Sequence, residues 1–279
     1  MPRIRKLVAA LSRRGPHRVL RGDLAFAGLP GVVYTPEAGL NLPGIAFGHG
    51  WLTGTDRYSR LLEHLASWGI VAGAPETQRG LAPSVLNLAF DLGTALDIVA
   101  GVRLGPGNIS VHPAKLALAG HGLGGSAAVF AAAGMPAKPA AVVAIFPTVT
   151  SPPAEQPAAS LKVPGLILTA PGDPKTLNSN ALELSRAWDA ATLRIVSKAE
   201  AGGVAEGRRL TTVLGLPGPD RKTQRSVRAL LTGYLLYTLG GDKTYRDFAD
   251  PDVHLPKTDP IDPEALPVTP EEKIVALLK

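Results

Sequence analysis

Short runs of apolar residues alternate along this chain with longer stretches whose apolar residues recur at helical spacing. The short runs are apolar on both faces, which is typical of strands in a parallel sheet covered on both sides. We expect strands at 44–47, 69–72, 115–119, 140–146, 165–169 and 193–196, and helices at 59–68, 84–102, 124–133, 177–188 and 223–239. Right-handed crossovers between such strands predict an α/β fold, a doubly wound and mostly parallel sheet with helices on both faces.

The pattern changes towards the two ends of the chain. Residues 17–26 and 31–34, joined by a Gly-Leu-Pro turn, predict a hairpin that forms an antiparallel N-terminal edge. Residues 148–162 are rich in Pro, Ser and Ala and are long enough only for a minimal lid. We therefore expect a basic arm over 1–16 and one domain over 17–241. Over 242–279 we expect a proline-rich, acidic tail that packs on the domain or serves as a docking peptide for a partner.

Composition and charge narrow the classes of function. The chain has 279 residues, 45% of them hydrophobic, which is enough for the core of one large domain. It has no cysteine, and this excludes disulfides, thiolate metal ligands and a cysteine nucleophile. The net charge of +6 arises in the first 21 residues, which hold seven basic side chains and no acidic one. The remaining chain is close to neutral, so we expect no nucleic acid partner.

The basic segment 1–21 has two interpretations. It is either a solvated leader helix or a segment that contacts an anionic membrane surface or an acidic protein partner. Its apolar run, 7–11, is too short for a signal peptide, and no apolar stretch is long enough to span a bilayer. We expect a protein of the cytoplasm or of the inner face of the membrane.

The most informative stretch is 115–126, in which a strand runs through a glycine-rich turn into a helix of small residues. It resembles the nucleophile elbow G-x-S-x-G of α/β-hydrolases, with Gly120 and Gly124 as the flanking glycines and Gly122 in the place of the serine. The residue at that place must hold a positive φ, which costs a side chain about 1–3 kcal/mol and glycine almost nothing. Gly122 has no hydroxyl and cannot form an acyl-enzyme. We expect Ser126, one helical turn further on, to be a buried packing residue.

The resemblance to α/β-hydrolases covers residues 20–250 or so, and is greatest for the dienelactone hydrolase, cutinase and polyester hydrolase branch. Residues 47–51 match the H-G type of oxyanion loop, and Asp173 takes the place of the catalytic acid. The resemblance implies that backbone N–H groups of this loop and of the residue after the nucleophile bind an oxyanion or ligand. The residues concerned are His49, Gly50, Trp51, Leu52 and Leu123.

The histidine base that this resemblance requires is missing. The loop at 198–207 contains none, and His254 is the one histidine that follows the acid place. A replacement base could come from His121, acting with Asp173 on a water molecule, or from His254 in the tail. His49 and His121 could also approach each other beside Asp173, but no metal-ligand spacing supports such a site, and we expect no metal and no cofactor.

The sequence therefore leaves three functional hypotheses. The first is a non-catalytic hydrolase-fold protein that binds an apolar acyl or ester-like ligand, or a protein partner, in a retained pocket over Gly122. The second is a carboxylic-ester hydrolase with a non-standard catalytic set. The third is a scaffolding role at the cell envelope through the basic arm. The glycine-rich turn at 120–125 could also hold an anion on its backbone N–H groups.

Overall fold

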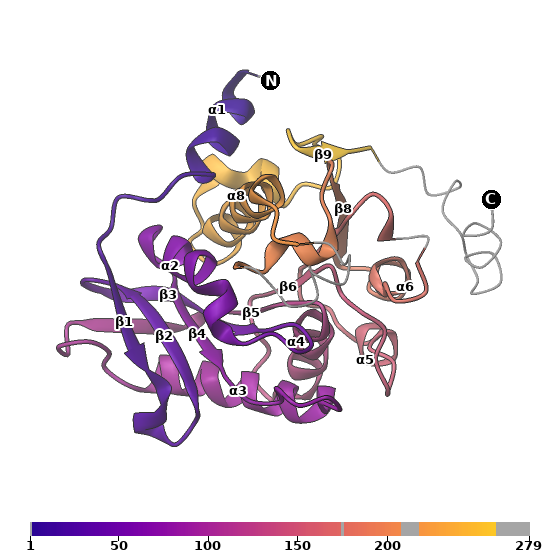
Figure 1. The fold of residues 1–279 in the computed structure, drawn as a ribbon. Helices are drawn as coiled ribbons and strands as arrows, with labels where there is room; N and C mark the ends of the chain where they lie inside the picture. Colours follow the sequence, from indigo (N-terminus) through magenta and orange to yellow (C-terminus); the bar gives the residue numbers. More distant parts are fainter. Residues whose placement is uncertain (1, 174–175, 208–217, 261–279) are drawn as a thin grey trace.

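The computed structural model describes residues 2–173, 176–207 and 218–260 (Figure 1). Within these residues, nine strands form one sheet in the order β1-β2-β4-β3-β5-β6-β7-β8-β9. The strands are β1 (Val19–Asp23), β2 (Gly31–Pro36), β3 (Gly39–Gly48), β4 (Val71–Pro75), β5 (Ile109–His121), β6 (Ala141–Ile145), β7 (Gly165–Thr169), β8 (Ala191–Val196) and β9 (Thr258–Asp259). The strands from β4 to β8 in this order are parallel, whereas β1, β2 and β9 pair antiparallel with their neighbours.

Helices cover both faces of the sheet. The α-helices are α1 (Pro2–Leu11), α2 (Ser59–Ser67), α3 (Val85–Gly101), α4 (Leu123–Gly134), α5 (Glu155–Ala158), α6 (Ala181–Ala187) and α8 (Arg221–Thr238). Short 3₁₀ helices are η1 (Leu24–Ala27), η2 (Thr55–Tyr58), η4 (Ala201–Val204) and η5 (Lys243–Phe248). The helices α1, α2 and α8 pack on one face, and α3, α4, α5 and α6 pack on the other. Figure 1 shows α8 and α3 on opposite sides of the sheet.

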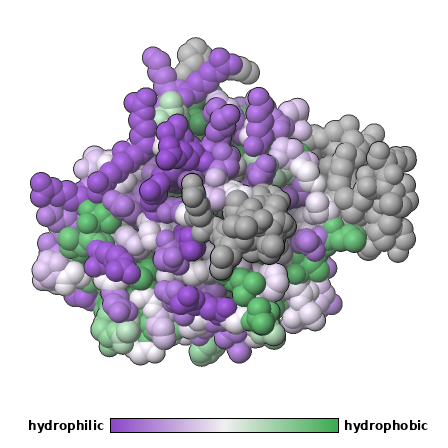
Figure 2. Space-filling model, viewed as in Figure 1, coloured by the Kyte–Doolittle hydropathy of each residue, from purple (hydrophilic) through white to green (hydrophobic). Residues whose placement is uncertain are grey.

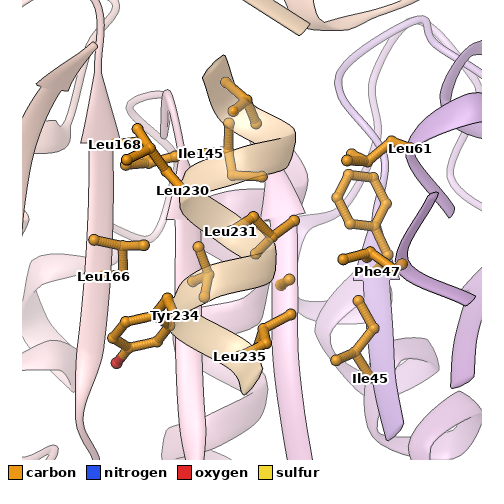
Figure 3. Packing of buried hydrophobic residues seen from close by; sticks show 14 of the residues in the cluster. Ile45, Phe47, Leu61, Ile145, Leu166, Leu168, Leu230, Leu231, Tyr234 and Leu235 are labelled. Atoms are coloured by element: carbon orange, nitrogen blue, oxygen red, sulfur yellow. The ribbon is translucent and has the colours of Figure 1, made fainter. Parts of the chain in front are cut away.

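The alternation of side chains along each strand explains the two layers. Ile45 and Phe47 of β3 belong to the cluster under α8, whereas Ala46 between them faces α3 and α4. Figure 3 shows Leu231 and Leu235 of α8 pointing towards these strands. This is the α/β-hydrolase fold with an antiparallel N-terminal edge, as predicted. The segment 148–162 carries only the four-residue helix α5, so the lid is minimal.

Several element boundaries differ from those predicted, most of all the starts of β3, β5 and α6. Strand β5 begins at Ile109, six residues earlier than expected, because its first half pairs with the first half of β3 across irregular register shifts. Helix α6 begins at Ala181 and not at 177, because the preceding residues pair with the loop after β6. There the N–H of Val149 donates to the carbonyl of Asn178, and the N–H of Asn180 donates to that of Pro147.

The N-terminal arm is not the solvated helix of the first interpretation. Ile4, Val8 and Leu11 of α1 are buried in the cluster under α8, while the basic side chains of the arm remain exposed. Figure 2 shows these hydrophilic side chains gathered around α1 at the top of the molecule. Behind the helix, the N–H of Gly15 donates to Ser67 Oγ, and Trp68 Nε1 donates to the carbonyl of Arg13. The amphipathic face of α1 is therefore part of the core.

The described part of the tail, 242–260, packs first against α8 and then against the outer strand β8. Phe248 and Leu255 are buried, and Arg194 of β8 donates to the carbonyls of Asp250 and Val253. Strand β9 then extends the sheet beside β8. The remainder of the tail, 261–279, lies outside the described residues. Of the helices described, none is both long and apolar enough to cross a membrane.

The buried His64 of α2 makes stability depend on pH. Burial and, to a lesser extent, the charge of Arg228 lower the pKa of His64 to about 4, against a hydrogen bond with the backbone of Leu11 that raises it. Since the unfolded chain protonates His64 near its ordinary pKa of 6.5, it binds more protons than the folded chain between these values. We expect His64 to lower the free energy of unfolding by about 3 kcal/mol as the pH falls from 7 to 4.

Urea unfolding at pH values from 4 to 7 measures this dependence. A His64→Leu variant should lose this part of the slope, whereas His254→Gln, which alters an exposed histidine, should keep it. An equal slope in wild type and His64→Leu would contradict the assignment to His64.

Candidate functional site

The turn between β5 and α4 has the backbone of a nucleophile elbow. Gly122 holds φ 57° and ψ −120°, a conformation that L side chains rarely adopt. Its N–H donates to the carbonyl of Ile145 in β6, and its carbonyl accepts from the N–H of Gly125 in the first turn of α4. The positive φ predicted for this position is confirmed.

The flanking glycines allow backbone segments to touch. A Cβ on Gly120 would overlap the carbonyl of Gly124, and a Cβ on Gly124 would overlap the carbonyl of Gly48 at the end of β3. The start of α4 therefore lies directly against the ends of β3 and β5. By contrast, a Cβ on Gly122 would lie 3.7 Å from Cα of Gly50 and 3.8 Å from Cγ2 of Thr148, which is ordinary van der Waals contact. The place of the nucleophile has room for a side chain and holds none.

A chain of hydrogen bonds links the three loops around this place. The N–H of Gly50, in the loop after β3, donates to the hydroxyl of Tyr58 across 3.0 Å. The Tyr58 hydroxyl lies 2.8 Å from Nδ1 of His121, and Nε2 of His121 lies 2.8 Å from the carbonyl of Ala201 in η4. Since a carbonyl can only accept, Nε2 carries the proton and Nδ1 accepts from Tyr58. The oxyanion loop, the elbow and the loop after β8 are thus held together.

This network gives His121 a structural position. The ring is buried, with 6% of the residue exposed, and it packs against the rings of Tyr58 and Phe146. Both ring nitrogens face partners, so a role as a general base would require His121 to leave them. Tyr58 was not singled out in the sequence, and the one signal for it is that a buried tyrosine needs a hydrogen-bond partner.

The ring nitrogens of His49 also face fixed partners. It is fully buried, with Nε2 2.6 Å from the carbonyl of Thr77 and Nδ1 2.9 Å from that of Gly50. These contacts join the loop after β3 to the loop after β4. No group of three or more metal-ligating side chains occurs in the described part of the chain. The structure does not assemble His49, His121 and Asp173 into a metal site, since the ring nitrogens face other partners.

Asp173 follows β7, at the place of the catalytic acid, but its carboxylate is turned to the backbone. Oδ2 accepts from the N–H of Ala170 across 3.1 Å, and no histidine among the described residues is bonded to the carboxylate. Burial raises the pKa of Asp173, and the hydrogen bond from Ala170 opposes this rise. His254 is exposed on the tail outside β8, two strands beyond β6, and its neighbour Val253 is held by Arg194. Neither Asp173 nor His254 is therefore placed to act as a base at position 122.

Ser126 is the packing residue that its position predicts. It is fully buried, and Oγ donates to the carbonyl of Thr148 across 2.6 Å. The bond fixes the start of α4 to the loop after β6. Ser126 is therefore not a relocated nucleophile in this structure.

Five exposed apolar side chains surround the elbow, and we call them the apolar rim. They are Trp51, Leu52, Leu81, Val149 and Leu177, each about half exposed or more. They come from the loops after β3, β4, β6 and β7, and the carboxyl ends of these parallel strands meet at one edge. Trp51 Nε1 donates to the carbonyl of Leu81, which holds two of these loops together.

The fold and the elbow define an α/β-hydrolase-type, ester-hydrolase-like protein. The model of the family described as chlorophyllase matches residues 24–173, more than half of the chain, and the chain belongs to this family. A comparison with curated proteins finds no match. The predicted superfamily is confirmed, with chlorophyllase as the family within it. The matched residues include Gly122 and Asp173, whereas the loop after β8 lies beyond them.

The glycines of the elbow should differ sharply in their tolerance of a side chain. Gly122→Ser is expected to fold with a loss of about 1–3 kcal/mol in the free energy of unfolding, because only the positive φ opposes it. Gly120→Ala and Gly124→Ala should lose more or fail to fold, because a methyl group would overlap backbone atoms. Chemical unfolding measures all three variants.

Gly93→Ala is the matched control for this series. Gly93 lies within α3, and a Cβ there would have no neighbour within 4 Å. We expect this variant to gain about 0.5–1 kcal/mol from the better helix propensity of alanine. A Gly122→Ser variant that loses as much as Gly120→Ala would contradict the space described at the elbow.

Replacing Asp173 should stabilise the protein at neutral pH. The raised pKa means that the folded protein disfavours the charged carboxylate more than the unfolded chain does. Asp173→Asn retains an oxygen for the N–H of Ala170 and removes the charge. We expect it to be more stable than wild type at pH 7, with a difference that shrinks as the pH falls through the folded pKa. Asp97→Asn, at an exposed site on α3, should change little; a loss of stability in Asp173→Asn would refute the expectation.

Proposed function

We propose that this member of the chlorophyllase family binds an apolar carboxylic acid or ester at the apolar rim and does not hydrolyse it. The observation that carries the proposal is the intact elbow backbone around a glycine. Ester hydrolysis by this fold needs a hydroxyl at position 122 and a histidine to take its proton. Gly122 supplies no hydroxyl, and the loop at 198–207 contains no histidine.

The alternative of a hydrolase with a non-standard catalytic set has less support. His121 is committed to Tyr58 and to the carbonyl of Ala201. The carboxylate of Asp173 is committed to the N–H of Ala170. A water molecule activated by both side chains would require both sets of bonds to break.

Two backbone groups support binding of a carboxyl or ester carbonyl. Among the described residues, no hydrogen bond engages the N–H of Trp51 or of Leu123. Leu123 is the first residue of α4, so its N–H lies at the positive end of the helix dipole. A carbonyl or carboxylate oxygen over Gly122 would meet these donors, as it would in an oxyanion hole.

The apolar rim supports an apolar chain on the same ligand. We place the chain of the ligand on this rim, against Trp51 and its neighbours. The family name refers to chlorophyll, and an apolar molecule of that kind fits this ligand class.

The basic arm supports a narrower proposal. An anionic membrane or acidic partner would meet exposed arginine and lysine side chains, because the apolar face of α1 is buried. Contact through 1–21 would therefore depend on charge and weaken as salt is added.

Binding of dodecanoate, followed by isothermal titration calorimetry, tests the site. Trp51→Ala is expected to weaken binding at least about ten-fold, because burial of a large apolar side chain contributes about 1.5–3 kcal/mol. Phe26→Ala is the matched control, since Phe26 is also an exposed aromatic residue but lies in η1, between β1 and β2. Absence of binding, or equal weakening by both variants, would contradict the proposed site.

A separate experiment tests whether the protein hydrolyses esters. The pure protein is treated with a fluorophosphonate, and its peptides are mapped by mass spectrometry. Hydrolysis of p-nitrophenyl butyrate is measured in parallel. We expect no labelled serine and no turnover above that of buffer. A label on any serine, or turnover that His121→Gln abolishes, would show a working hydrolase.

A further inference from the structure

A concave site lies between the starts of α2 and α8. Its cavity has a volume of about 430 Å³, and its lining includes Arg57, Arg60, Arg221 and Glu206. Arg57 and Arg60 come from η2 and α2, Glu206 from the segment after η4, and Arg221 from the first turn of α8. Three arginines in one cavity are a local concentration of positive charge, because the chain after residue 21 is close to neutral overall.

Glu206 neutralises these arginines only in part. Its carboxylate accepts from the backbone N–H groups of Arg60 and Leu61, at the start of α2. Arg57 donates to the backbone carbonyl of Glu206 and pairs with the exposed Asp56 at 3.3 Å. The negative charge of Glu206 is therefore directed at a helix N-terminus, while burial raises the pKa of its carboxyl group.

Positive charge is crowded behind the cavity. Arg225 and Arg228 follow Arg221 on α8, at spacings that bring their side chains to neighbouring positions. Burial lowers the pKa of the half-buried Arg228, and the like charges of Arg60 and Arg225 lower it further against Glu206. Such crowding costs free energy unless an anion is present to balance it.

The described residues that line the cavity carry more positive than negative charge. The positive side chains are Arg57, Arg60 and Arg221, and the negative ones are Asp56 and Glu206. Lys222, Arg225 and Arg228 add positive charge on α8, where Asp220 caps the N-terminus through the N–H groups of Lys222 and Thr223. An anion in the cavity would offset this excess.

We propose that this cavity binds a phosphate group. The planar guanidinium fork donates two parallel hydrogen bonds to phosphate oxygens, and Arg60 of α2 and Arg221 of α8 both line the cavity. With a volume of about 430 Å³, the cavity has room for a phosphate monoester. The same group occurs on soluble esters and on lipid headgroups of the phosphatidic acid type. The inference does not depend on the function proposed for the elbow.

Calorimetric titration with inorganic phosphate, at neutral pH and low ionic strength, tests the site on the full chain. Arg60→Gln and Arg221→Gln are each expected to weaken binding at least about ten-fold, since a hydrogen bond to a charged group contributes about 1.5–3 kcal/mol. Arg103→Gln, which alters an exposed arginine after α3, should bind as wild type does. No binding to wild type, or equal binding in all variants, would overturn the proposal.

Thermal unfolding separates a binding role from a structural one. Without phosphate, Arg60→Gln should melt at the same temperature as wild type or higher, because the variant relieves like-charge crowding. With phosphate, only wild type and Arg103→Gln should gain in melting temperature. An Arg60→Gln variant that melts well below wild type without phosphate would assign Arg60 to structure and overturn its role as a ligand.

Sedimentation with vesicles distinguishes the two sources of the phosphate group. The vesicles are phosphatidylcholine alone or phosphatidylcholine with phosphatidic acid. Binding of phosphate without binding to either vesicle supports a soluble ester. Binding to phosphatidic acid vesicles that both arginine variants abolish supports a headgroup. Vesicle binding that survives both variants but is lost in Arg5→Gln/Lys6→Gln would place the lipid contact on α1 and, if phosphate itself does not bind, overturn the cavity site.

Discussion

The contact between backbone segments at the start of α4 is the constraint on which the site depends. Gly48, Gly120 and Gly124 bring the ends of β3 and β5 against the first turn of the helix, closer than any side chain allows. A chain that turns this tightly must pass through a positive φ, and it does so at Gly122. The elbow is thus a product of packing between glycines and does not require a nucleophile. The elbow keeps its backbone conformation with a glycine in the place of the serine.

The hydrogen bonds around the elbow have a structural purpose of their own. In a working hydrolase, the triad itself connects the elbow to the loop after β8. Here His121, one residue before the nucleophile place, makes that connection through Ala201, and Tyr58 extends it to Gly50 in the oxyanion loop. The loops keep their positions without a proton relay. Under the proposed function, the apolar rim and the backbone N–H groups of Trp51 and Leu123 are the parts that bind the ligand.

Patterns local in sequence were predictable, and contacts between distant segments were not. The buried strands and the elbow at Gly122 follow from apolar runs and from glycine spacing. The bond between Tyr58 and His121 depends on the register of β3 and β5, which no local pattern encodes. The docking of α1 was missed because its short apolar face is surrounded by basic residues. The sequence also could not predict that the arginines of α2 and α8 line one cavity, since over 150 residues separate them in the chain.

The empty elbow also has an evolutionary consequence. A serine that arises at position 122 would be strained by about 1–3 kcal/mol and would find no histidine in the loop after β8. A histidine that arises first in that loop would find no hydroxyl, and it would compete with His121 for the space beside Ala201. Each step is neutral or harmful without the other. Under the proposed function, the loss of hydrolysis is difficult to reverse. A single mutation suffices to abolish hydrolysis, whereas its recovery requires both a serine and a histidine.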